Sequence, residues 1–575
     1  MNTVNLESLM KLTPRQRDSP SRVVFGSIAF DSPEETLIAT RLDEVVPLLA
    51  SAERYARAGS YVAVMLSYEA APAFDPVLRV HSPGDFPLAW AAVFPQKHDV
   101  NAPVGPTLNS NSWTPQVSQN EYDKAIDRIR ELIAAGDTYQ VNYSFPLTSS
   151  FSGDAYAWYR SLCLAQGAQY SAYLDLGRYR VLCLSPELFF ERRGDHVVTK
   201  PMKGTARRGR WPAEDRELAQ WLKQSPKDRA ENVMIVDLLR NDLGKVSVPG
   251  SVLVSSLFEL ERFETVWQMT STVESTLRKG TSLVDLMTAL FPCGSITGAP
   301  KIRTMEIIRD LEPFPRGAYT GTIGLLMPGG DCIFNVAIRT VTIDTETSRA
   351  KFGVGGGVTI DSTAEREYEE CLVKSRFLHE PAVEFQLFES ILLEDGEYFL
   401  LARHLERLRD SAAYFGFEFP EEEITKAREQ KEQVGVFKVR LTLWKDGQIE
   451  TRITRIKAAD EHRSVMLAKE PVDSADRFLY HKTTRRDRYF EDVVLWNERG
   501  EVTEAGTTNV VVPIDGELFT PPITSGLLPG TFRAHLLEQG TIKERVIKIE
   551  ELPHEFFLIN SVRKWIRVHL RSSAA

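Results

Sequence analysis

The sequence predicts a multidomain protein of the α+β and α/β classes. Its 575 residues exceed what a single hydrophobic core usually serves, so two or more domains are expected. Up to Lys374, short apolar runs bounded by turn residues alternate with segments whose apolar residues recur at helical spacing. After Lys374 the pattern changes, and a new module runs from about Phe385 to Leu570. The expected domain ranges are 1–118, 119–380 and 385–575.

The composition argues against several functional classes. A net charge of −10 disfavours nucleic acid or an anionic membrane as the main partner. No apolar run reaches the roughly 20 residues of a membrane helix, and the first twenty residues are polar, unlike a signal peptide. The five cysteines show no C-x-x-C spacing, which suits buried thiols in a reducing compartment. A cytoplasmic protein is therefore expected.

The N-terminal third predicts mixed strands and helices. Residues 22–95 are expected to form short strands and turns with one helix. Apolar residues recur at helical spacing over Glu121–Ala135, which predicts an amphipathic helix. The strand Asp137–Ser144 follows, and alternation places Gln140 on the opposite side from its aromatic neighbours. Gln140 either lines a site or is a surface amide, and both interpretations are open at this point.

Two residues beside strands are candidates for acid and nucleophile. Glu187 follows the predicted strand Tyr179–Leu184, and a carboxyl group there acts as a general acid if burial raises its pKa. Lys203 lies in Pro201–Thr205, and a lysine attacks carbon when desolvation lowers its pKa. The alternatives are a solvated carboxylate and a solvated surface lysine.

Two predicted helices carry paired acids. Asp228 and Glu231 share a face of the first helix, and Glu367 and Glu370 share a face of the second. Carboxylates together with water are the ligands that Mg²⁺ prefers. The alternative is a solvated first turn, which the helix dipole also favours.

Two small-residue segments suit anions. Ser295 lies in the segment Cys293–Lys301, which precedes a predicted helix over Ile302–Leu311, and helix N-termini bind anions. The glycine-rich segment Gly353–Val358 lets backbone amides close around a ligand. A crowded strand crossing is the competing interpretation of those glycines.

Together these motifs resemble the chorismate-utilising enzymes, which include the synthase components for aminodeoxychorismate and anthranilate and the isochorismate synthases. The similarity covers residues 120–378 and implies an antiparallel β-sandwich with outer helices. It implies that Glu187 protonates the departing C4 hydroxyl group and that Mg²⁺ holds the ring carboxylate of chorismate. The implied metal-site residues are Glu231, Glu370, Asp228 and Glu367. The implied substrate-binding residues are Gln140, Ser295, Tyr319, Arg339, Gly355, Gly356, Gly357 and Lys374.

Lys203 indicates which reaction to expect within that family. Aminodeoxychorismate synthases resemble this chain in carrying a lysine there, where anthranilate synthases carry alanine. The resemblance implies that Lys203 attacks C2 of chorismate while the C4 hydroxyl leaves, and that ammonia then adds at C4 and expels the lysine. Gln140 stands where water-using isochorismate synthases carry a lysine base, which favours ammonia as the nucleophile. Gln268 departs from the usual histidine, so a proton-transfer role at that position is in doubt.

The second module brings together residues that suit pyridoxal phosphate. Lys482 ends a strand-like run, and Glu504 precedes a small-residue turn. Gly526–Arg533 opens a helix that suits phosphate, and Arg407 lies on the predicted helix Ala402–Phe415. A lysine, a lone carboxylate and phosphate donors are the groups that this cofactor requires.

The second module resembles the fold-type IV pyridoxal phosphate enzymes, which include aminotransferases and aminodeoxychorismate lyase. The resemblance implies two small α/β subdomains, a Schiff-base lysine at Lys482 and a partner for the pyridine nitrogen at Glu504. The implied phosphate-binding residues are Arg407, the backbone amides of Thr531 and Phe532, and Ser561.

The two resemblances predict one bifunctional enzyme of 4-aminobenzoate and folate synthesis. The first step aminates chorismate with Mg²⁺, and the second eliminates pyruvate with pyridoxal phosphate. No cysteine lies in a glutaminase-type G-x-C-x-G turn, so ammonia is expected from a separate glutamine amidotransferase subunit or from free ammonium. A homodimer through the second module is a further expectation. The alternatives are an anthranilate or isochorismate synthase fused to an aminotransferase, or to a non-catalytic docking domain.

Overall fold

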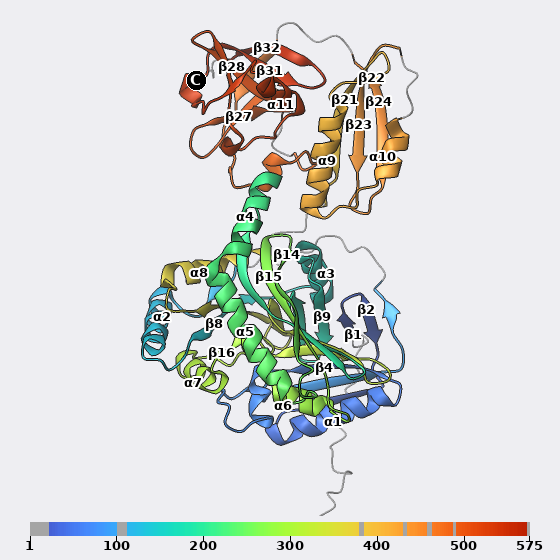
Figure 1. Cartoon of the computed structure of the whole chain (residues 1–575), viewed down its shortest axis with the longest axis vertical. Coiled ribbons are helices and arrows are strands. Elements are labelled where there is room, and N and C mark those ends of the chain that lie inside the picture. Colours follow the sequence, from blue (N-terminus) through green and yellow to red (C-terminus); the bar gives the residue numbers. More distant parts are fainter. Residues whose placement is uncertain are drawn as a thin grey trace, which may run out of the picture. The chain divides into compact units, whose positions relative to one another are not determined.

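The computed structural model (Figure 1) describes residues 22–100, 112–378, 384–428, 434–456, 463–486, 490 and 492–571. Residues 1–20, where no signal peptide is expected, lie outside this part. The chain divides into two compact units. The first comprises Met1–Thr205 and Leu222–Ala382, and the second comprises Ala206–Trp221 and Val383–Ala575. The expected domain boundary near residue 380 stays a prediction, because residues 379–383 are not described.

The first unit is built on two antiparallel sheets. In the first sheet the strand order is β16 (Gly298–Ala299), β8 (Gln140–Ser150), β20 (Arg349–Val358), β19 (Thr340–Asp344), β10 (Tyr179–Ser185), β9 (Tyr170–Asp175), β1 (Arg22–Phe25), β2 (Ile28–Asp31) and β6 (His98–Asp99), with β7 (Thr114–Pro115) beside β8. In the second it is β13 (Met202–Arg207), β15 (Val266–Thr276), β12 (His196–Lys200), β11 (Leu188–Arg193), β18 (Cys332–Val336), β17 (Thr322–Leu326), β4 (Tyr61–Leu66), β5 (Ala89–Phe94) and β3 (Glu35–Ala39), with β14 (Leu253–Arg262) beside β15.

The two sheets pack face to face, and helices cover their outer faces. Phe30 and Leu174 of the first sheet and Trp90 and Ile323 of the second lie in one buried cluster between them. Apolar residues of α1 (Leu42–Arg57), α5 (Pro226–Gly244) and α6 (Leu283–Leu290) pack on the second sheet. Those of α2 (Gln119–Ala134), α3 (Ala155–Gln166), α7 (Lys301–Leu311) and α8 (Ala364–Val373) pack on the first. The predicted antiparallel sandwich with outer helices is confirmed.

Local caps set helix boundaries that periodicity alone does not place. Helix α2 begins two residues before the predicted Glu121, because the Ser118 hydroxyl accepts a hydrogen bond from the Glu121 amide and the Glu121 carboxylate accepts one from the Ser118 amide. Helix α5 begins at Pro226, because Ser225 caps it and proline suits the first helical position. Helix α5 therefore presents Asp228 in its first turn, with Glu231 one turn further on the same face.

The second unit contains two further sheets. The smaller is antiparallel, with strand order β22 (Glu397–Tyr398), β21 (Leu387–Glu394), β23 (Val436–Leu443) and β24 (Ile449–Arg455). Helix α9 (Leu401–Phe415) packs on it, and α10 (Glu421–Arg428) follows α9 in the chain. The larger sheet has the order β27 (Val502–Ala505), β26 (Val493–Trp496), β25 (Arg463–Leu467), β32 (Lys564–Leu570), β31 (Glu555–Asn560), β28 (Thr508–Ile514), β29 (Glu517–Thr520) and β30 (Lys543–Glu544). Its pairs β25–β26, β25–β32 and β29–β30 are parallel. The two sheets and their separate cores match the two expected subdomains.

Residues 206–221 form part of the second unit, and this segment includes the first turns of α4 (Pro212–Gln224). Arg208 forms a bidentate ion pair with Asp215, with both N–O distances at 2.8 Å, and also donates to the Tyr414 carbonyl oxygen at 3.0 Å. The Trp211 ring lies 5.1 Å from the Tyr480 ring. Arginine in such a bidentate pair binds strongly, so this segment is held tightly within the second unit.

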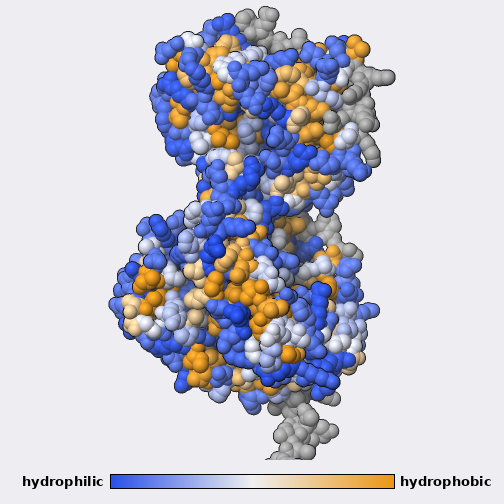
Figure 2. Space-filling model, in the orientation of Figure 1, coloured by the Kyte–Doolittle hydropathy of each residue, from blue (hydrophilic) through white to orange (hydrophobic). Residues whose placement is uncertain are grey.

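The surface drawn in Figure 2 is mainly hydrophilic, with apolar residues in separate groups. Within the described residues, no helix is long and apolar enough to cross a membrane.

Candidate active sites

Lys203 lies on β13, where backbone contacts hold its strand in place. The side-chain amide of Asn232 donates to the Lys203 carbonyl oxygen at 3.3 Å and accepts from the Ser271 hydroxyl at 2.5 Å. Gly204 follows with a φ of +95°, and a Cβ atom there would lie 2.9 Å from Cβ of Asp228. Burial lowers the pKa of Lys203, while the Glu231 and Glu187 carboxylates oppose that shift. Lys203 therefore loses its proton more readily than a lysine at the protein surface.

Glu187 follows β10 and is buried close to Lys203. Its amide donates to the Ser185 hydroxyl at 3.1 Å, which fixes the turn before β11. Burial raises the pKa of Glu187 to about 7, against the opposing effects of a Ser295 hydrogen bond and the Lys203 charge. Its Oε1 atom has no hydrogen-bond partner among the described residues. A carboxyl group with this pKa is protonated in part at neutral pH, as a general acid requires.

Gln140, Lys203 and Gly357 meet at one point. A Cβ atom on Gly357 would lie 2.0 Å from Nε2 of Gln140 and 3.0 Å from Nζ of Lys203. Gln140 is 1% exposed, and neither atom of its amide has a hydrogen-bond partner in the described part of the chain. A buried amide without partners is costly, so one that lies beside the Lys203 amine indicates a ligand site. The surface-amide interpretation of Gln140 is wrong.

The paired acids of α5 and α8 influence each other electrostatically. Burial raises the pKa of Glu231, the Lys203 and Lys227 charges oppose this, and the Asp228 and Glu367 charges add to it. Glu367 accepts a hydrogen bond from Ser362 at 2.7 Å, and Glu370 pairs with Lys374 at 2.8 Å.

This donor set fits Mg²⁺ in charge and in chemistry. Oxygen ligands dominate the set, and a dication relieves the mutual repulsion of carboxylates. Among the described residues, the only three His, Cys, Asp or Glu side chains with ligand atoms all within 4.8 Å of one another are His554, Glu555 and His569. The acids of α5 and α8 are more widely spaced, as for an ion that keeps several waters.

The expected carboxylate-binding residues are only partly brought together. Nζ of Lys374 donates to the Gly355 carbonyl oxygen at 2.9 Å. Tyr319 is buried, which raises its pKa, while Lys374 is among the charges that oppose this shift. Arg339 has a φ of 50° and donates to Gln166 at 2.8 Å, and burial lowers its pKa to about 10. Strained backbone of this kind often marks functional sites.

Some supporting residues were not predicted from the sequence. Asn232 donates a hydrogen bond to the backbone of Lys203. The only signal in the sequence for this role is that Asn232 directly follows Glu231 on α5. Gln268, which replaces the usual histidine of the resembling family, accepts a hydrogen bond from Thr205 at 3.1 Å. Its amide thus contacts the residue two positions after Lys203.

In the second unit, Lys482 is buried beside a basic and aromatic cluster. Burial lowers its pKa to about 7, and the Arg486 and Arg407 charges add to this effect. The Glu389 and Glu504 carboxylates oppose the shift, so both lie within electrostatic reach. The Lys482 carbonyl oxygen accepts a hydrogen bond from the Phe388 amide at 3.0 Å. A lysine with this pKa is suited to covalent bonding with an aldehyde cofactor.

Glu504 and the start of α11 (Thr531–Glu538) supply the other expected cofactor groups. Glu504 is 2% exposed on β27 and pairs in register with Asn509 of β28. Asn509 in turn donates to the Leu528 carbonyl oxygen at 2.9 Å, which ties β28 to the turn before α11. The amides of Thr531 and Phe532 lie in the first turn of that helix, where anions bind.

A buried ion network, missed in the sequence, joins Arg407 to this helix. Arg407 donates to both oxygens of Glu389 at 2.8 and 2.7 Å, and to the Pro529 carbonyl oxygen at 3.0 Å. His404 Nδ1 lies 2.7 Å from Glu389, and His404 Nε2 lies 3.2 Å from the Thr531 hydroxyl. Ser561, the last expected phosphate ligand, donates to the Ser390 carbonyl oxygen at 3.4 Å.

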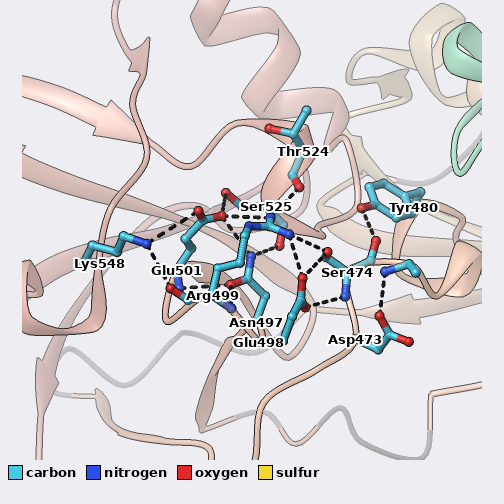
Figure 3. Close-up of polar contacts among 11 residues, drawn as sticks. Asp473, Ser474, Tyr480, Asn497, Glu498, Arg499, Glu501, Thr524, Ser525 and Lys548 are labelled. Atoms are coloured by element: carbon cyan, nitrogen blue, oxygen red, sulfur yellow. Dashed lines mark hydrogen bonds and ion pairs between the residues drawn. The ribbon is translucent and has the colours of Figure 1, made fainter.

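A second polar network holds the chain just before Lys482 (Figure 3). The Tyr480 hydroxyl donates to the Ser474 carbonyl oxygen at 2.7 Å. Arg499 donates to the Ser474 hydroxyl at 2.8 Å and to Glu501 at 2.9 Å. The network thus ties the Tyr480 side chain, two residues before Lys482, to a segment that Arg499 also holds. Lysine, carboxylate and helix N-terminus together fit pyridoxal phosphate in donor chemistry.

Comparisons with known proteins give a family for each part of the chain. The model of the chorismate binding enzyme family matches residues 25–380, and that of Amino-transferase class IV matches residues 386–570. The chain is 43% identical over 271 residues to aminodeoxychorismate synthase component 1 of Salmonella typhimurium, which covers 47% of this chain and 59% of that one. It is 39% identical over 261 residues to anthranilate synthase component 1 of Thermus thermophilus, which covers 45% of this chain and 56% of that one.

A solved structure shows the same fold in the first unit. Anthranilate synthase component I of Streptococcus pneumoniae superposes with a TM-score of 0.55 and 23% identity, covering 64% of this chain and 95% of that one. The chain therefore spans less than two thirds of the curated relatives it matches, and nearly all of this solved chain.

Proposed function

Because the chain belongs to the chorismate binding enzyme family and carries a class IV aminotransferase module, we propose that it makes 4-aminobenzoate from chorismate in two steps. The first unit replaces the C4 hydroxyl of chorismate with ammonia, giving 4-amino-4-deoxychorismate and water. The second unit eliminates pyruvate from that product and leaves the aromatic ring. The observation that carries this proposal is the convergence of Lys203, Gln140 and Gly357, with Glu187 buried nearby and its pKa raised to about 7.

In the first step, Lys203 acts as the nucleophile. Its buried amine attacks C2, the ring double bond shifts, and the C4 hydroxyl leaves as water with the proton of Glu187. Ammonia then adds at C4 and the double bond returns, which expels the lysine amine. Gln140 supports this order because an amide cannot deprotonate water, so it does not promote the competing addition of hydroxide.

Charged side chains around Lys203 would hold the two carboxylates of chorismate. Glu231 and Glu370 would bind Mg²⁺, with Asp228 and Glu367 nearby, and the ion would neutralise the ring carboxylate. Tyr319, Lys374, Arg339 and the amides of Gly355–Gly357 would hold the carboxylates in the orientation that the attack needs. Keeping the substrate in one geometry is itself a large part of the rate enhancement.

In the second step, Lys482 removes the C4 proton. Pyridoxal phosphate, when bound, acidifies that carbon–hydrogen bond by acting as an electron sink. Glu504 would pair with the ring nitrogen, while Arg407, Ser561 and the Thr531 and Phe532 amides would hold the phosphate. Loss of the proton expels the enolpyruvyl group as enolpyruvate, which takes up a proton to give pyruvate, and aromaticity makes this step strongly downhill.

The ammonia supply follows from the same reasoning. The relative from Salmonella typhimurium is named component 1, which indicates an enzyme of more than one component. This chain has no glutaminase-type cysteine turn. A separate glutamine amidotransferase subunit would therefore deliver ammonia, and free ammonium would replace it at high pH.

Anthranilate synthesis is a second candidate for the first unit, because the relative from Thermus thermophilus is 39% identical. The Lys482→Ala variant separates the candidates, because it stops the second step and lets the first product accumulate. With chorismate, Mg²⁺ and ammonium, we expect 4-amino-4-deoxychorismate by chromatography. Anthranilate would favour the second candidate.

Visible absorbance tests the second unit directly. Wild-type protein with added pyridoxal phosphate should show the band of lysine-bound cofactor, and Lys482→Ala should lose it. The matched control Lys469→Ala, at an exposed lysine, should keep the band. A colourless wild type would mean that the module is a docking domain.

A further inference from the structure

The two cations of the first site that would hold substrate carboxylates differ in how their charges are balanced. Nζ of Lys374 lies 2.8 Å from the Glu370 carboxylate, so the protein itself supplies a counter-charge. Arg339 forms no ion pair with any described residue, and desolvation alone lowers its pKa, to about 10. A half-buried guanidinium without a counter-charge gains most from an anion that arrives from outside the protein.

The Arg339 guanidinium is held by an uncharged acceptor. Its Nη1 atom donates to Oε1 of Gln166 at 2.8 Å, and within the described part of the chain this is the one hydrogen bond that the guanidinium makes. Gln166 is 5% exposed, so the contact is buried. An amide oxygen accepts a hydrogen bond but carries no net charge. Gln166 can therefore orient the guanidinium without neutralising it.

Both ends of this contact are fixed by the fold. Gln166 is the last residue of α3, and Gly167 ends the helix with a φ of 57°. Trp158 of the same helix is buried in the core that α3 shares with the first sheet. At the other end, the Arg339 carbonyl oxygen accepts a hydrogen bond from the Leu184 amide at 3.1 Å. A fixed backbone and a fixed acceptor together restrict the directions in which the guanidinium can point.

We propose that Gln166 is a positioning residue of the first site, whose amide oxygen orients the Arg339 guanidinium toward a carboxylate of the substrate and leaves its positive charge unneutralised. This inference rests on the proposed function, in which Arg339 holds a carboxylate of chorismate. Gln166 acts through Arg339 and takes no part in the reaction itself. A carboxylate in its place would bind the guanidinium as an ion pair and compete with the substrate.

A purely structural role, in which Gln166 only completes the packing at the end of α3, predicts a different order of variants. Gln166→Glu keeps the shape and the acceptor and adds a charge, whereas Gln166→Met keeps the approximate length and removes the acceptor. With a structural role, Gln166→Met is the more harmful change. With the positioning role, Gln166→Glu is the more harmful change for substrate binding, because it neutralises Arg339.

Chorismate binding separates the two roles. It is measured by calorimetry with Mg²⁺ and without ammonium, in a Lys203→Ala reference protein that cannot capture the substrate covalently. Gln166→Glu should raise the Kd about 10- to 100-fold, because a charge-assisted hydrogen bond to the substrate is lost. Gln166→Met should raise it about 3- to 10-fold, because only the orientation of the guanidinium is lost. The matched control Gln224→Glu, at the exposed last residue of α4, should bind like the reference.

An unchanged Kd in Gln166→Glu would overturn the proposal. A larger Kd in Gln166→Met than in Gln166→Glu would also overturn it and make the role structural. If the Kd values follow the expected order but the wild type forms no 4-amino-4-deoxychorismate, the role of Gln166 stands and the proposed reaction fails. A reference protein that does not bind chorismate would contradict both.

Thermal unfolding without chorismate gives a second readout. Gln166→Glu should unfold at the temperature of the reference or above it, because the new carboxylate pairs with a cation that lacks a counter-charge. Weaker substrate binding in a protein of equal stability is a result that a packing role does not produce. A lower unfolding temperature for Gln166→Glu would mean that no ion pair with Arg339 forms, and it would overturn the proposal.

Discussion

At the scale of single residues, environment decides what Lys203 and Glu187 can do. Glu187 is buried and Lys203 is half-buried, and desolvation penalises the charged form of each, so the lysine tends toward the amine and the glutamate toward the acid. Their mutual attraction opposes both shifts but does not cancel them. A neutral nucleophile next to a neutral acid is the protonation state that amine attack with loss of hydroxide requires.

Lys203→Ala tests the nucleophile. Wild-type protein incubated with chorismate and Mg²⁺, without ammonium, should gain the mass of chorismate less one water, as measured by intact-protein mass spectrometry. Lys203→Ala should gain nothing, because the attacking amine is gone. Lys223→Ala, at an exposed lysine of α4, should behave like the wild type. Full capture by Lys203→Ala would remove Lys203 from this role.

The pH dependence of the first step should report Glu187. Its pKa is raised to about 7, so its acid form is present below that pH and is lost as pH rises through it. With ammonia kept saturating, kcat/KM for chorismate should therefore fall above about pH 7. Glu187→Gln should lower turnover by about 10²- to 10⁴-fold and lack this alkaline limb. An unchanged limb in that variant would assign it to another group.

Glu231→Gln should weaken the magnesium response. Removing one charged ligand should raise the Mg²⁺ concentration for half-maximal activity by about 10- to 100-fold. Asp237→Asn is the control, because Asp237 is exposed on the same helix and pairs with Arg240. A magnesium titration identical to that of the wild type would give Glu231 a structural role instead.

At the scale of elements, strand β20 shapes the first site because its glycines have no side chains. Its glycines let the backbone approach Gln140, Lys203 and the acids of α8. The sequence left two interpretations of these glycines, close approach of a ligand and a crowded strand crossing. Each of them describes part of the strand. A side chain on Gly353 would overlap the Tyr319 ring, which is a packing constraint, whereas one on Gly357 would occupy the site itself.

Gly357→Ala should therefore impair catalysis more than folding. The added methyl group would lie 2.0 Å from Nε2 of Gln140 and 3.0 Å from Nζ of Lys203, so the Gln140 amide would have to move, and a displacement of about 1 Å costs about 100-fold in rate. The comparison is Gly244→Ala, where nothing lies within 4 Å of the new carbon. Steady-state kinetics and thermal unfolding check this together. Wild-type kinetics in Gly357→Ala would show that the site is more open than the distances indicate.

The elements were predictable from the sequence where local rules dominate. Amphipathic periodicity and caps placed α2, α5 and α8 within a few residues, and motif order placed Lys203, Glu187 and the paired acids in one unit. The Glu389 network was not predicted, because it depends on how α9 packs against β21, which the sequence pattern does not show. The same holds for residues 206–221, which precede the α5 acids in sequence but pack with Tyr414 and Tyr480.

At the scale of the whole molecule, each unit has its own buried core and its own candidate site. Apolar clusters of the first unit lie between and outside its two sheets, and those of the second lie in its smaller and larger sheets. Because the cores are separate, a substitution at Lys203 should leave the Lys482 site intact, and a substitution at Lys482 should leave the Lys203 site intact. One chain would thus carry two consecutive reactions whose chemistry fits together.

The most direct test of this account is the product composition of the wild-type protein. Purified protein is incubated with chorismate, Mg²⁺, ammonium at high pH and pyridoxal phosphate, and the products are resolved by chromatography. The account predicts 4-aminobenzoate and pyruvate in equal amounts. Anthranilate or isochorismate would contradict the role of Lys203, and 4-amino-4-deoxychorismate that accumulates with cofactor present would contradict the lyase role of the second unit.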